Sequence, residues 1–167
     1  MNTDLQAIGW VAAALVTAMV VALITTPVVR ALAFRVGAVD VPKDSRRMHD
    51  HPIPRMGGLA IFFGFILSAI IYVEITPQFQ GMMLGAVIIV VLGIFDDIYA
   101  LGAKFKRLVQ IAAALVAVHF GNVIQIISNP NVLSPNPYWD LGWLAVPATV
   151  LWIVAITNAV NLIDGLD

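Results

Sequence analysis

An uncharged run from Ile8 to Val29 constrains the fold of this chain more than any other feature. As a helix rising 1.5 Å per residue, its 22 residues cover about 33 Å, which is enough to cross the hydrocarbon core of a bilayer. Asp4 precedes the run and Arg30 and Arg35 follow it, the reverse of the charge order in a secretory signal peptide. We therefore expect a retained transmembrane helix.

The composition also places the chain in a membrane. Hydrophobic residues make up 60% of the 167 residues and charged residues only 11%, whereas soluble domains carry about 25% charged residues. The chain has no cysteine, which excludes disulfides and thiolate metal sites. No repeat, linker or low-complexity tract divides it, so we expect a single transmembrane domain over residues 1–167.

Further apolar runs predict the rest of the fold, which we expect to be all-α and polytopic with about five transmembrane helices. The Gly57-Gly58 pair at the start of one run permits a close approach between helices. Two polar stretches, Arg30–Met56 and Ser128–Asp140, are predicted as loop or interfacial segments, and Trp139 and Trp143 suit an interfacial aromatic belt. The four further runs are Gly57–Thr76, Gly81–Phe95 (extended back to Phe79), Leu108–Ile127 and Gly142–Thr157.

The distribution of cations predicts the orientation. All nine Lys and Arg residues lie in two connecting segments, and the opposite loops have none. By the positive-inside rule these segments are cytoplasmic and the N-terminus is outside. The same rule places residues 158–167 on the cytoplasmic face. The nine cations are Arg30, Arg35, Lys43, Arg46, Arg47, Arg55, Lys104, Lys106 and Arg107.

Acidic clusters close two of the apolar runs on this predicted face. Asp96 and Asp97 end one run, and Asn158, Asn161, Asp164 and Asp167 follow another. Carboxylate oxygens are preferred ligands of Mg²⁺, which keeps room for substrate phosphates. Adjacent aspartates on a helix point in different directions, so we expect one of Asp96 and Asp97 to be a direct ligand. Helix capping at the membrane interface is the alternative for both clusters.

Cations near the acidic clusters are candidate phosphate ligands. Lys104 and Lys106 open a predicted helix, whose free N–H groups also favour anions. Arg46, Arg47 and Arg55 suit a nucleotide diphosphate through bidentate contacts, and His49 is a further donor. The alternative is that these cations only set the orientation. Together, the two kinds of charge favour phosphoryl transfer between a soluble nucleotide and a lipid phosphate.

Three motifs resemble the polyprenyl-phosphate N-acetylhexosamine-1-phosphate transferases, which are bacterial membrane enzymes of glycosyltransferase family 4. The match covers essentially the whole chain. The motifs read Arg-Arg-Met-His at 46–49 followed by Pro-Arg-Met-Gly-Gly-Leu-Ala at 54–60, then Gly-Ile-Phe-Asp-Asp at 93–97, then Asn-Ala-Val-Asn-Leu-Ile-Asp-Gly-Leu-Asp at 158–167.

The resemblance implies Mg²⁺-dependent transfer of GlcNAc-1-phosphate from UDP-GlcNAc to undecaprenyl phosphate with release of UMP, which initiates cell-wall or surface polysaccharide synthesis of the teichoic-acid or O-antigen type. Mn²⁺ is an alternative metal. The implied catalytic residues are Asp96, Asp97, Asp164 and Asp167, with Asp97 and Asp164 as metal ligands. Asn161 matches a family position beside the diphosphate and the metal. Together with the candidates drawn from the residues themselves, the expected substrate-binding residues are Asn158, Asn161, Arg46, Arg47, His49, Arg55, Lys104 and Lys106.

The resemblance also implies the bacterial plasma (inner) membrane, an active site facing the cytoplasm and no nucleic-acid partner, and it leaves a homodimer open. Family members run to about twice this length, so the chain looks like an N-terminal portion that we expect to be inactive alone.

Other functions are not excluded at this point. A phospho-MurNAc-pentapeptide transferase of peptidoglycan synthesis is the nearest alternative, although those relatives have Pro-Thr-Met-Gly-Gly and Asn-Leu-Thr-Asp-Gly. A noncatalytic transporter or scaffold would be expected to place its carboxylates at mid-membrane depth, whereas the acids here lie at span ends. A CDP-alcohol enzyme would carry a longer acidic signature, which is missing.

Overall fold

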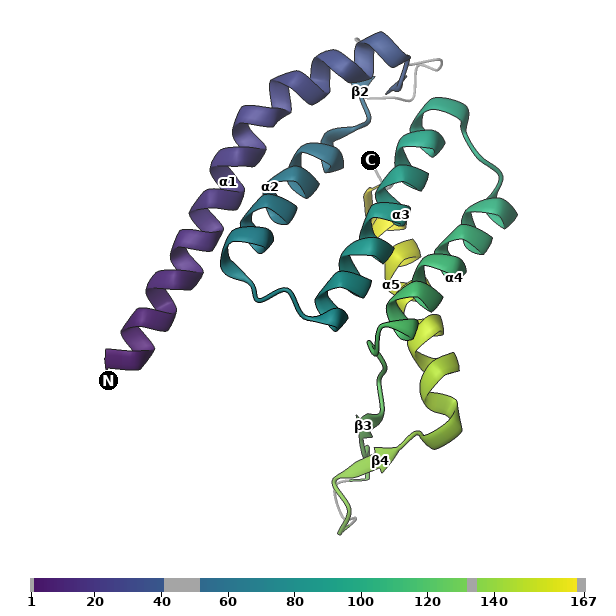
Figure 1. The fold of residues 1–167 in the computed structure, drawn as a ribbon. Helices are drawn as coiled ribbons and strands as arrows, with labels where there is room; N and C mark the ends of the chain where they lie inside the picture. The colour runs from purple at the N-terminus through teal and green to yellow at the C-terminus, as the bar shows by residue number, and fades with distance from the viewer. Residues whose placement is uncertain (1, 41–51, 132–134, 165–167) are drawn as a thin grey trace. The chain divides into compact units, whose positions relative to one another are not determined.

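The computed structural model is helical, as the sequence predicts (Figure 1), and it describes residues 2–40, 52–131 and 135–164. Short antiparallel strand pairs and one 3-10 helix complete the described part. In chain order the elements are α1 (Asn2–Val36), β1 (Val39–Asp40), β2 (Ile53–Pro54), α2 (Gly57–Tyr72), α3 (Pro77–Tyr99), α4 (Ala103–His119), β3 (Ile126–Ser128), β4 (Tyr138–Asp140), η1 (Gly142–Leu144) and α5 (Ala145–Asp164).

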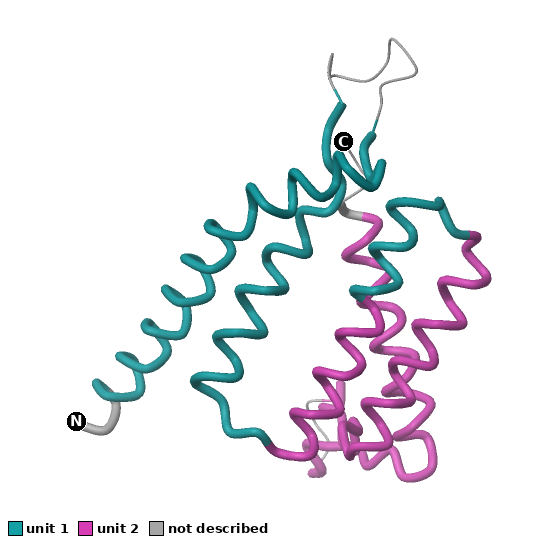
Figure 2. Tube along the Cα trace, turned by 45° about the horizontal axis from the view of Figure 1, so that its top comes forward, with its two compact units in different colours: residues 1–75, 90–101 teal, residues 76–89, 102–167 magenta. Residues whose placement is uncertain are grey.

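The chain forms two compact units, shown in different colours in Figure 2. Unit 1 comprises Met1–Ile75 and Val90–Leu101, and unit 2 comprises Thr76–Ile89 and Gly102–Asp167. The helix α3 runs through both, because its first half belongs to unit 2 and its second half to unit 1. The single transmembrane domain expected from the sequence stays a prediction.

Three helices are long and apolar enough to span a bilayer among the residues that the structure describes. They cover Leu5–Val36, Pro77–Tyr99 and Gly142–Leu162, and Gly57–Tyr72 is a shorter apolar helix. Large apolar side chains on these helices are exposed, which suits contact with lipid rather than water. The chain is therefore a multi-pass membrane protein, while the count of five spans and their orientation stay predictions.

In unit 1, α1 and α2 pack through small residues. A Cβ added at Gly64 would lie 2.3 Å from the Ala18 carbonyl oxygen, so only glycine permits this approach. About one helical turn away, the buried Ser68 hydroxyl donates to the Ala14 carbonyl at 2.7 Å. At Gly57 and Gly58, which would also permit a close approach, an added Cβ meets nothing within 4 Å in the described part of the chain, so the close contact lies at Gly64 instead.

A small core joins the ends of α1 and α2 to the strand pair β1–β2. Val39 pairs with Pro54 and Asp40 with Ile53, which brings α2 back against α1. Partly buried side chains from α2 and the second half of α3 cover this core, namely Leu59, Ile94 and Ile98. The core residues themselves are Val29, Ala33, Ala38, Met56 and Ala60.

In unit 2, α4 and α5 run antiparallel. At one end the Ile124 N–H donates to the Thr149 hydroxyl at 2.8 Å, and at the other the Asn158 amide donates to the Gln110 carboxamide oxygen at 2.7 Å. Increasing residue numbers along α4 therefore correspond to decreasing residue numbers along α5. Ala113, Ala114 and Ala117 are buried on α4, and a Cβ added at Gly85 of α3 would lie 3.1 Å from the Ala113 carbonyl oxygen, so small residues also permit a close approach of α3 to α4.

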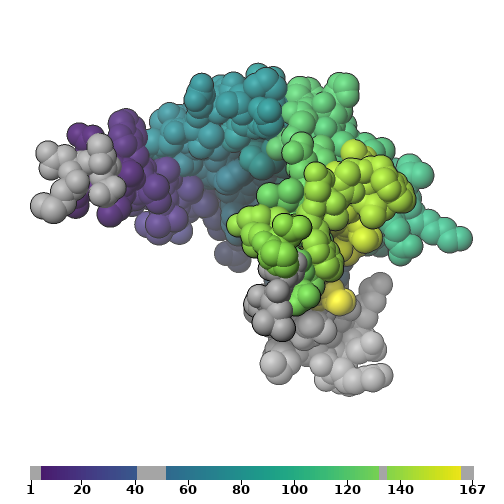
Figure 3. All heavy atoms as spheres, turned by 90° about the horizontal axis from the view of Figure 1, so that it is seen from below, coloured from purple at the N-terminus to yellow at the C-terminus, as the bar shows by residue number. Residues whose placement is uncertain are grey.

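An exposed hairpin connects α4 to α5. Strands β3 and β4 pair from Ile126 with Asp140 to Ser128 with Tyr138, and all of their residues are exposed. Yellow-green atoms around residue 140 stand at the front in Figure 3. Trp139 and Trp143 are among the exposed residues, and their place in an interfacial aromatic belt stays a prediction.

Several helix ends differ from the predicted spans. Helix α1 continues through Pro27, Arg30 and Arg35 to Val36, so the predicted loop from Arg30 begins seven residues too early. Helix α4 starts before Lys104 and ends at His119, because the residues that follow turn at Gly121 (φ +93°) and form β3. Charge and hydropathy locate where a helix enters the membrane, whereas its hydrogen-bonded ends lie elsewhere.

Candidate active site

The last turn of α3 carries the first acidic cluster. Asp96 and Asp97 are half-buried residues inside the helix, which ends two residues later at Tyr99. The Leu101 N–H donates to the Asp96 Oδ1 at 2.9 Å, and the Ala100 N–H donates to the Asp96 carbonyl at 2.8 Å. One oxygen of Asp96 thus holds the turn that follows α3. This bond is part of the helix-capping role that is the alternative reading of the acidic cluster.

The turn after Asp97 is held in an unfavourable backbone conformation. Ala100 has φ of +49°, a left-handed value that costs an L-residue other than glycine roughly 1–2 kcal/mol. Such residues often cluster at functional sites. The hydrogen bonds from Ala100 and Leu101 to Asp96 hold the turn in this conformation, so the backbone that follows the acidic pair is well defined.

The charges at the ends of α3 and α4 both oppose the helix macrodipole. Two aspartates lie in the last turn of α3, and Lys104, Lys106 and Arg107 lie in the first turns of α4. A helix C-terminus favours cations and an N-terminus favours anions, each by about 0.3–1 kcal/mol. Both sets of charged side chains are therefore placed against the dipoles of their own helices.

The second acidic cluster lies at the end of α5. The Asn158 Nδ2 donates to the Gln110 Oε1 and to the Val154 carbonyl, both at 2.7 Å. Asn161 is exposed one turn further on, and the helix continues to Asp164, whose side chain is outside the described part. The role of Gln110 was missed, since an isolated glutamine in an apolar run carries no local signal of its partner.

Arg55 is the described member of the predicted basic cluster before α2. Its Nη2 lies 3.1 Å from the Asp40 Oδ1 across the β1–β2 pair, and both side chains are largely exposed at 44% and 37%. The predicted ligands Arg46, Arg47 and His49 lie outside the described residues, as does Asp167.

The two acidic clusters belong to different units. Asp96 and Asp97 are in unit 1, and Asn158, Asn161 and Asp164 are in unit 2. Their convergence on one ion therefore stays a prediction, as does the assignment of Asp97 and Asp164 to the metal. Within the described side chains, no group of three or more His, Cys, Asp or Glu residues lies close enough to hold a metal ion.

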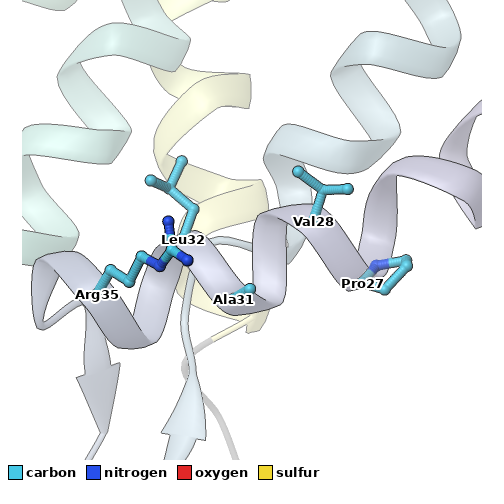
Figure 4. A pocket seen from close by; sticks show the side chains of 5 residues that line it. All are labelled: Pro27, Val28, Ala31, Leu32 and Arg35. Atoms are coloured by element: carbon cyan, nitrogen blue, oxygen red, sulfur yellow. The ribbon is translucent and has the colours of Figure 1, made fainter.

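A pocket on α1 contains none of the predicted site residues. It has a volume of about 470 Å³ and is formed by successive turns of one helix face (Figure 4). Its lining is apolar except for one arginine at the C-terminal side, and its residues are Pro27, Val28, Ala31, Leu32 and Arg35.

Comparison with known proteins decides the family. A model of glycosyl transferase family 4 matches residues 79–167, which include the second and third motifs. The chain belongs to this family. The resemblance drawn from the three motifs is confirmed, and the family assignment covers α3, α4 and α5.

Full-length members of the family extend the match to the first motif. The chain is 46% identical over 157 residues to a probable undecaprenyl-phosphate N-acetylglucosaminyl 1-phosphate transferase of Bacillus subtilis, covering 92% of this chain and 42% of that protein. It is 32% identical over 160 residues to a decaprenyl-phosphate N-acetylglucosaminephosphotransferase of Mycobacterium tuberculosis, covering 90% of this chain and 39% of that protein.

A phospho-N-acetylmuramoyl-pentapeptide-transferase of a Wolbachia strain is 33% identical over 127 residues, covering 69% of this chain and 38% of that protein. The chain thus spans about two fifths of the length of the curated relatives that it matches. No solved structure matches significantly.

Proposed function

We propose that this chain forms part of an enzyme that transfers GlcNAc-1-phosphate from UDP-GlcNAc to undecaprenyl phosphate and releases UMP. The observation that carries the proposal is the 46% identity with the Bacillus subtilis protein over 92% of the chain. The product would be the first lipid-linked sugar of a cell-wall or surface polysaccharide. The enzyme would lie in the bacterial plasma membrane with its active site facing the cytoplasm.

The reaction joins two anions, which explains the need for both kinds of charge. A phosphate oxygen of undecaprenyl phosphate forms a bond to the phosphorus that carries the sugar, and the bond from this phosphorus to UMP breaks. Little covalent chemistry is left to the protein in such a transfer, so positioning and charge stabilisation supply most of the catalysis. Lys104, Lys106 and Arg55 would bind the diphosphate together with Arg46, Arg47 and His49.

The carboxylates suit a hard divalent cation. Mg²⁺ prefers oxygen ligands, and the candidate donors here are carboxylates and amide oxygens with no sulfur among them. Asp97 and Asp164 would hold the ion, which neutralises charge on the diphosphate when it is bound. Asp96, whose Oδ1 already accepts a backbone hydrogen bond, is the better candidate for orienting undecaprenyl phosphate, the acceptor. Asp167 and Asn161 would bind the nucleotide part of UDP-GlcNAc.

Release of UMP tests this proposal. Membranes containing the full-length protein should release UMP from UDP-GlcNAc only when undecaprenyl phosphate and Mg²⁺ are both present. Asp97→Asn and Asp164→Asn should each lower the rate by a factor of about 100 or more, as expected when a charged group at the reacting centre is lost. Asp140→Asn, on the exposed hairpin, is the matched control and should keep the rate. Unchanged release in both test variants would remove these acids from the site.

The donor sugar separates this proposal from its nearest alternative. The similarity to the Wolbachia phospho-N-acetylmuramoyl-pentapeptide-transferase over 69% of the chain favours testing UDP-MurNAc-pentapeptide as a second donor. We expect that an excess of UDP-MurNAc-pentapeptide leaves UMP release from UDP-GlcNAc unchanged. Efficient turnover of the pentapeptide donor would instead assign the protein to peptidoglycan synthesis.

A further inference from the structure

Gln110 is a buried polar residue in the middle of α4, and its exposed fraction is 6%. It lies on the helix face that also buries Ala113, Ala114 and Ala117. Its Oε1 accepts the hydrogen bond from the Asn158 Nδ2. Since a buried carboxamide without a partner is costly, this bond strongly favours one alignment of α4 against α5.

The Asn158 amide is oriented by two acceptors. Its Nδ2 donates to the Val154 carbonyl, one turn back on α5, as well as to Gln110. Both N–H groups of the amide are thereby committed to the protein, because each carboxamide nitrogen carries two hydrogens. Asn158 was predicted to bind substrate, but these bonds assign its amide nitrogen to the contact between the helices.

The position of this contact sets which turns of the two helices lie level. Because α4 and α5 are antiparallel, moving from Gln110 toward Lys104 corresponds to moving from Asn158 toward Asp164. Each step is six residues, or about 9 Å of helix rise. The basic first turn of α4 is therefore level with the turn of α5 that ends at Asp164, and Lys106 is level with the region of Asn161.

We propose that Gln110 is a positioning residue that holds the acidic end of α5 in register with the basic start of α4 through Asn158. This inference rests on the proposed function, in which Lys104 and Lys106 bind the diphosphate and Asp164 binds the metal. A slip of one helix past the other would separate these groups, and a misplacement of about 1 Å at a reacting centre can cost roughly 100-fold in rate.

Two variants separate positioning from simple stabilisation in the full-length protein. Gln110→Leu removes the acceptor from Asn158. Thr149→Val is the matched control, because Thr149 is also buried, at 3%, and accepts a hydrogen bond from Ile124 in the connection that follows α4, at the far end of α5 from Asn158. We expect Gln110→Leu to lower kcat/KM for UDP-GlcNAc by a factor of about 10 to 100, and Thr149→Val by less than about threefold, at a similar loss in Tm.

An exchange of the two side chains tests the contact itself. Gln110→Asn shortens one partner by a methylene and Asn158→Gln lengthens the other, so the double variant can form the bond again. We expect each single variant to lose kcat/KM and the double variant to recover most of it. No recovery in the double variant would overturn the inference, as would equal losses in Gln110→Leu and Thr149→Val.

A cross-link reads the register without activity. This chain has no cysteine, so Lys106→Cys and Asn161→Cys are new sites within it that a short bis-maleimide can join, and the protein without these two substitutions measures the background reaction. The yield should fall several-fold when Gln110→Leu is added and stay unchanged with Thr149→Val. An unchanged yield with Gln110→Leu overturns the inference. If the unmodified protein releases no UMP, the proposed function fails, and the cross-link alone decides the register.

Discussion

Single residues at the end of α3 combine structural and chemical roles. The Asp96 Oδ1 accepts the Leu101 N–H, while its neighbour Asp97 points in a different direction on the same helix. The two carboxylates are therefore not equivalent. Removal of Asp96 disturbs the turn as well as the charge, and the two effects have to be separated by the choice of substitution.

Asp96→Asn and Asp96→Ala make this separation. Asparagine retains an oxygen that accepts from Leu101, so its free energy of unfolding should stay within about 0.5 kcal/mol of the unmodified protein, whereas alanine should lose about 1 kcal/mol. Both should lose UMP release if the charge is needed. Thermal unfolding in detergent and the UMP assay measure the two effects. Equal stability in the two variants would argue against the hydrogen bond.

Arg55 and Asp40 form an exposed ion pair, which contributes about 0–1 kcal/mol to stability. If Arg55 binds the diphosphate, Arg55→Lys should raise the KM for UDP-GlcNAc by a factor of about 10, because lysine cannot make the bidentate contact. Asp40→Asn removes the charge of the partner and serves as the control, with little change in KM. A similar rise in both variants would show that the ion pair, rather than the arginine alone, matters.

At the scale of elements, the contact between α1 and α2 depends on one glycine. Gly64→Ala would place a Cβ 2.3 Å from the Ala18 carbonyl oxygen, so the helices must separate. We expect a loss of about 1–3 kcal/mol in the free energy of unfolding, as in other overpacked contacts. Gly9→Ala in α1 is the control, since its Cβ meets nothing within 4 Å among the described residues. Thermal unfolding of both variants in detergent checks this.

The helices could be predicted from the sequence, but several of their ends could not. The start of α2 at Gly57 is as expected, because a change from polar to apolar residues coincides with the helix start there. The end of α1 was predicted at the first cation, Arg30. The helix instead continues past Arg35 to Val36 and stops at Gly37, whose φ is +77°. Hydropathy alone does not locate such a turn.

The residues after α4 show a second reason why the end of a helix was predicted wrongly. Val123, Ile124, Ile126 and Ile127 continue the apolar run, and were therefore assigned to the helix. Gly121 had already ended it, and β-branched residues of this kind favour strands, as in β3. The Gln110–Asn158 bond could not be predicted in the same way, because it joins residues 48 positions apart.

At the scale of the whole molecule, the predicted function requires one orientation in the membrane. The acidic clusters themselves could be located from the sequence, because each of them directly follows an apolar run. Their meeting in space is a property of the tertiary fold and could not be predicted from spacing. Membrane orientation is the first condition that both clusters must satisfy.

Labelling of engineered cysteines tests this orientation, because this chain contains no cysteine of its own. Ala103→Cys, next to the cations of α4, should react with an impermeant maleimide only from the cytoplasmic side. Asn136→Cys, in the connection between β3 and β4, should react only from the outside. Asn161→Cys should behave like Ala103→Cys. Reaction of Ala103→Cys and Asn161→Cys from opposite sides would exclude a shared site.

The alanine-rich core also has a calorimetric consequence. Eight of the eleven buried apolar residues in the described part are alanines, and no large side chain there is fully buried. Unfolding in detergent would therefore transfer little apolar surface into water, and the heat capacity of unfolding grows with that surface. We expect a change below the roughly 12–15 cal/mol/K per residue that is typical of soluble domains. Lost van der Waals contacts, rather than hydration, would then account for most of the unfolding enthalpy.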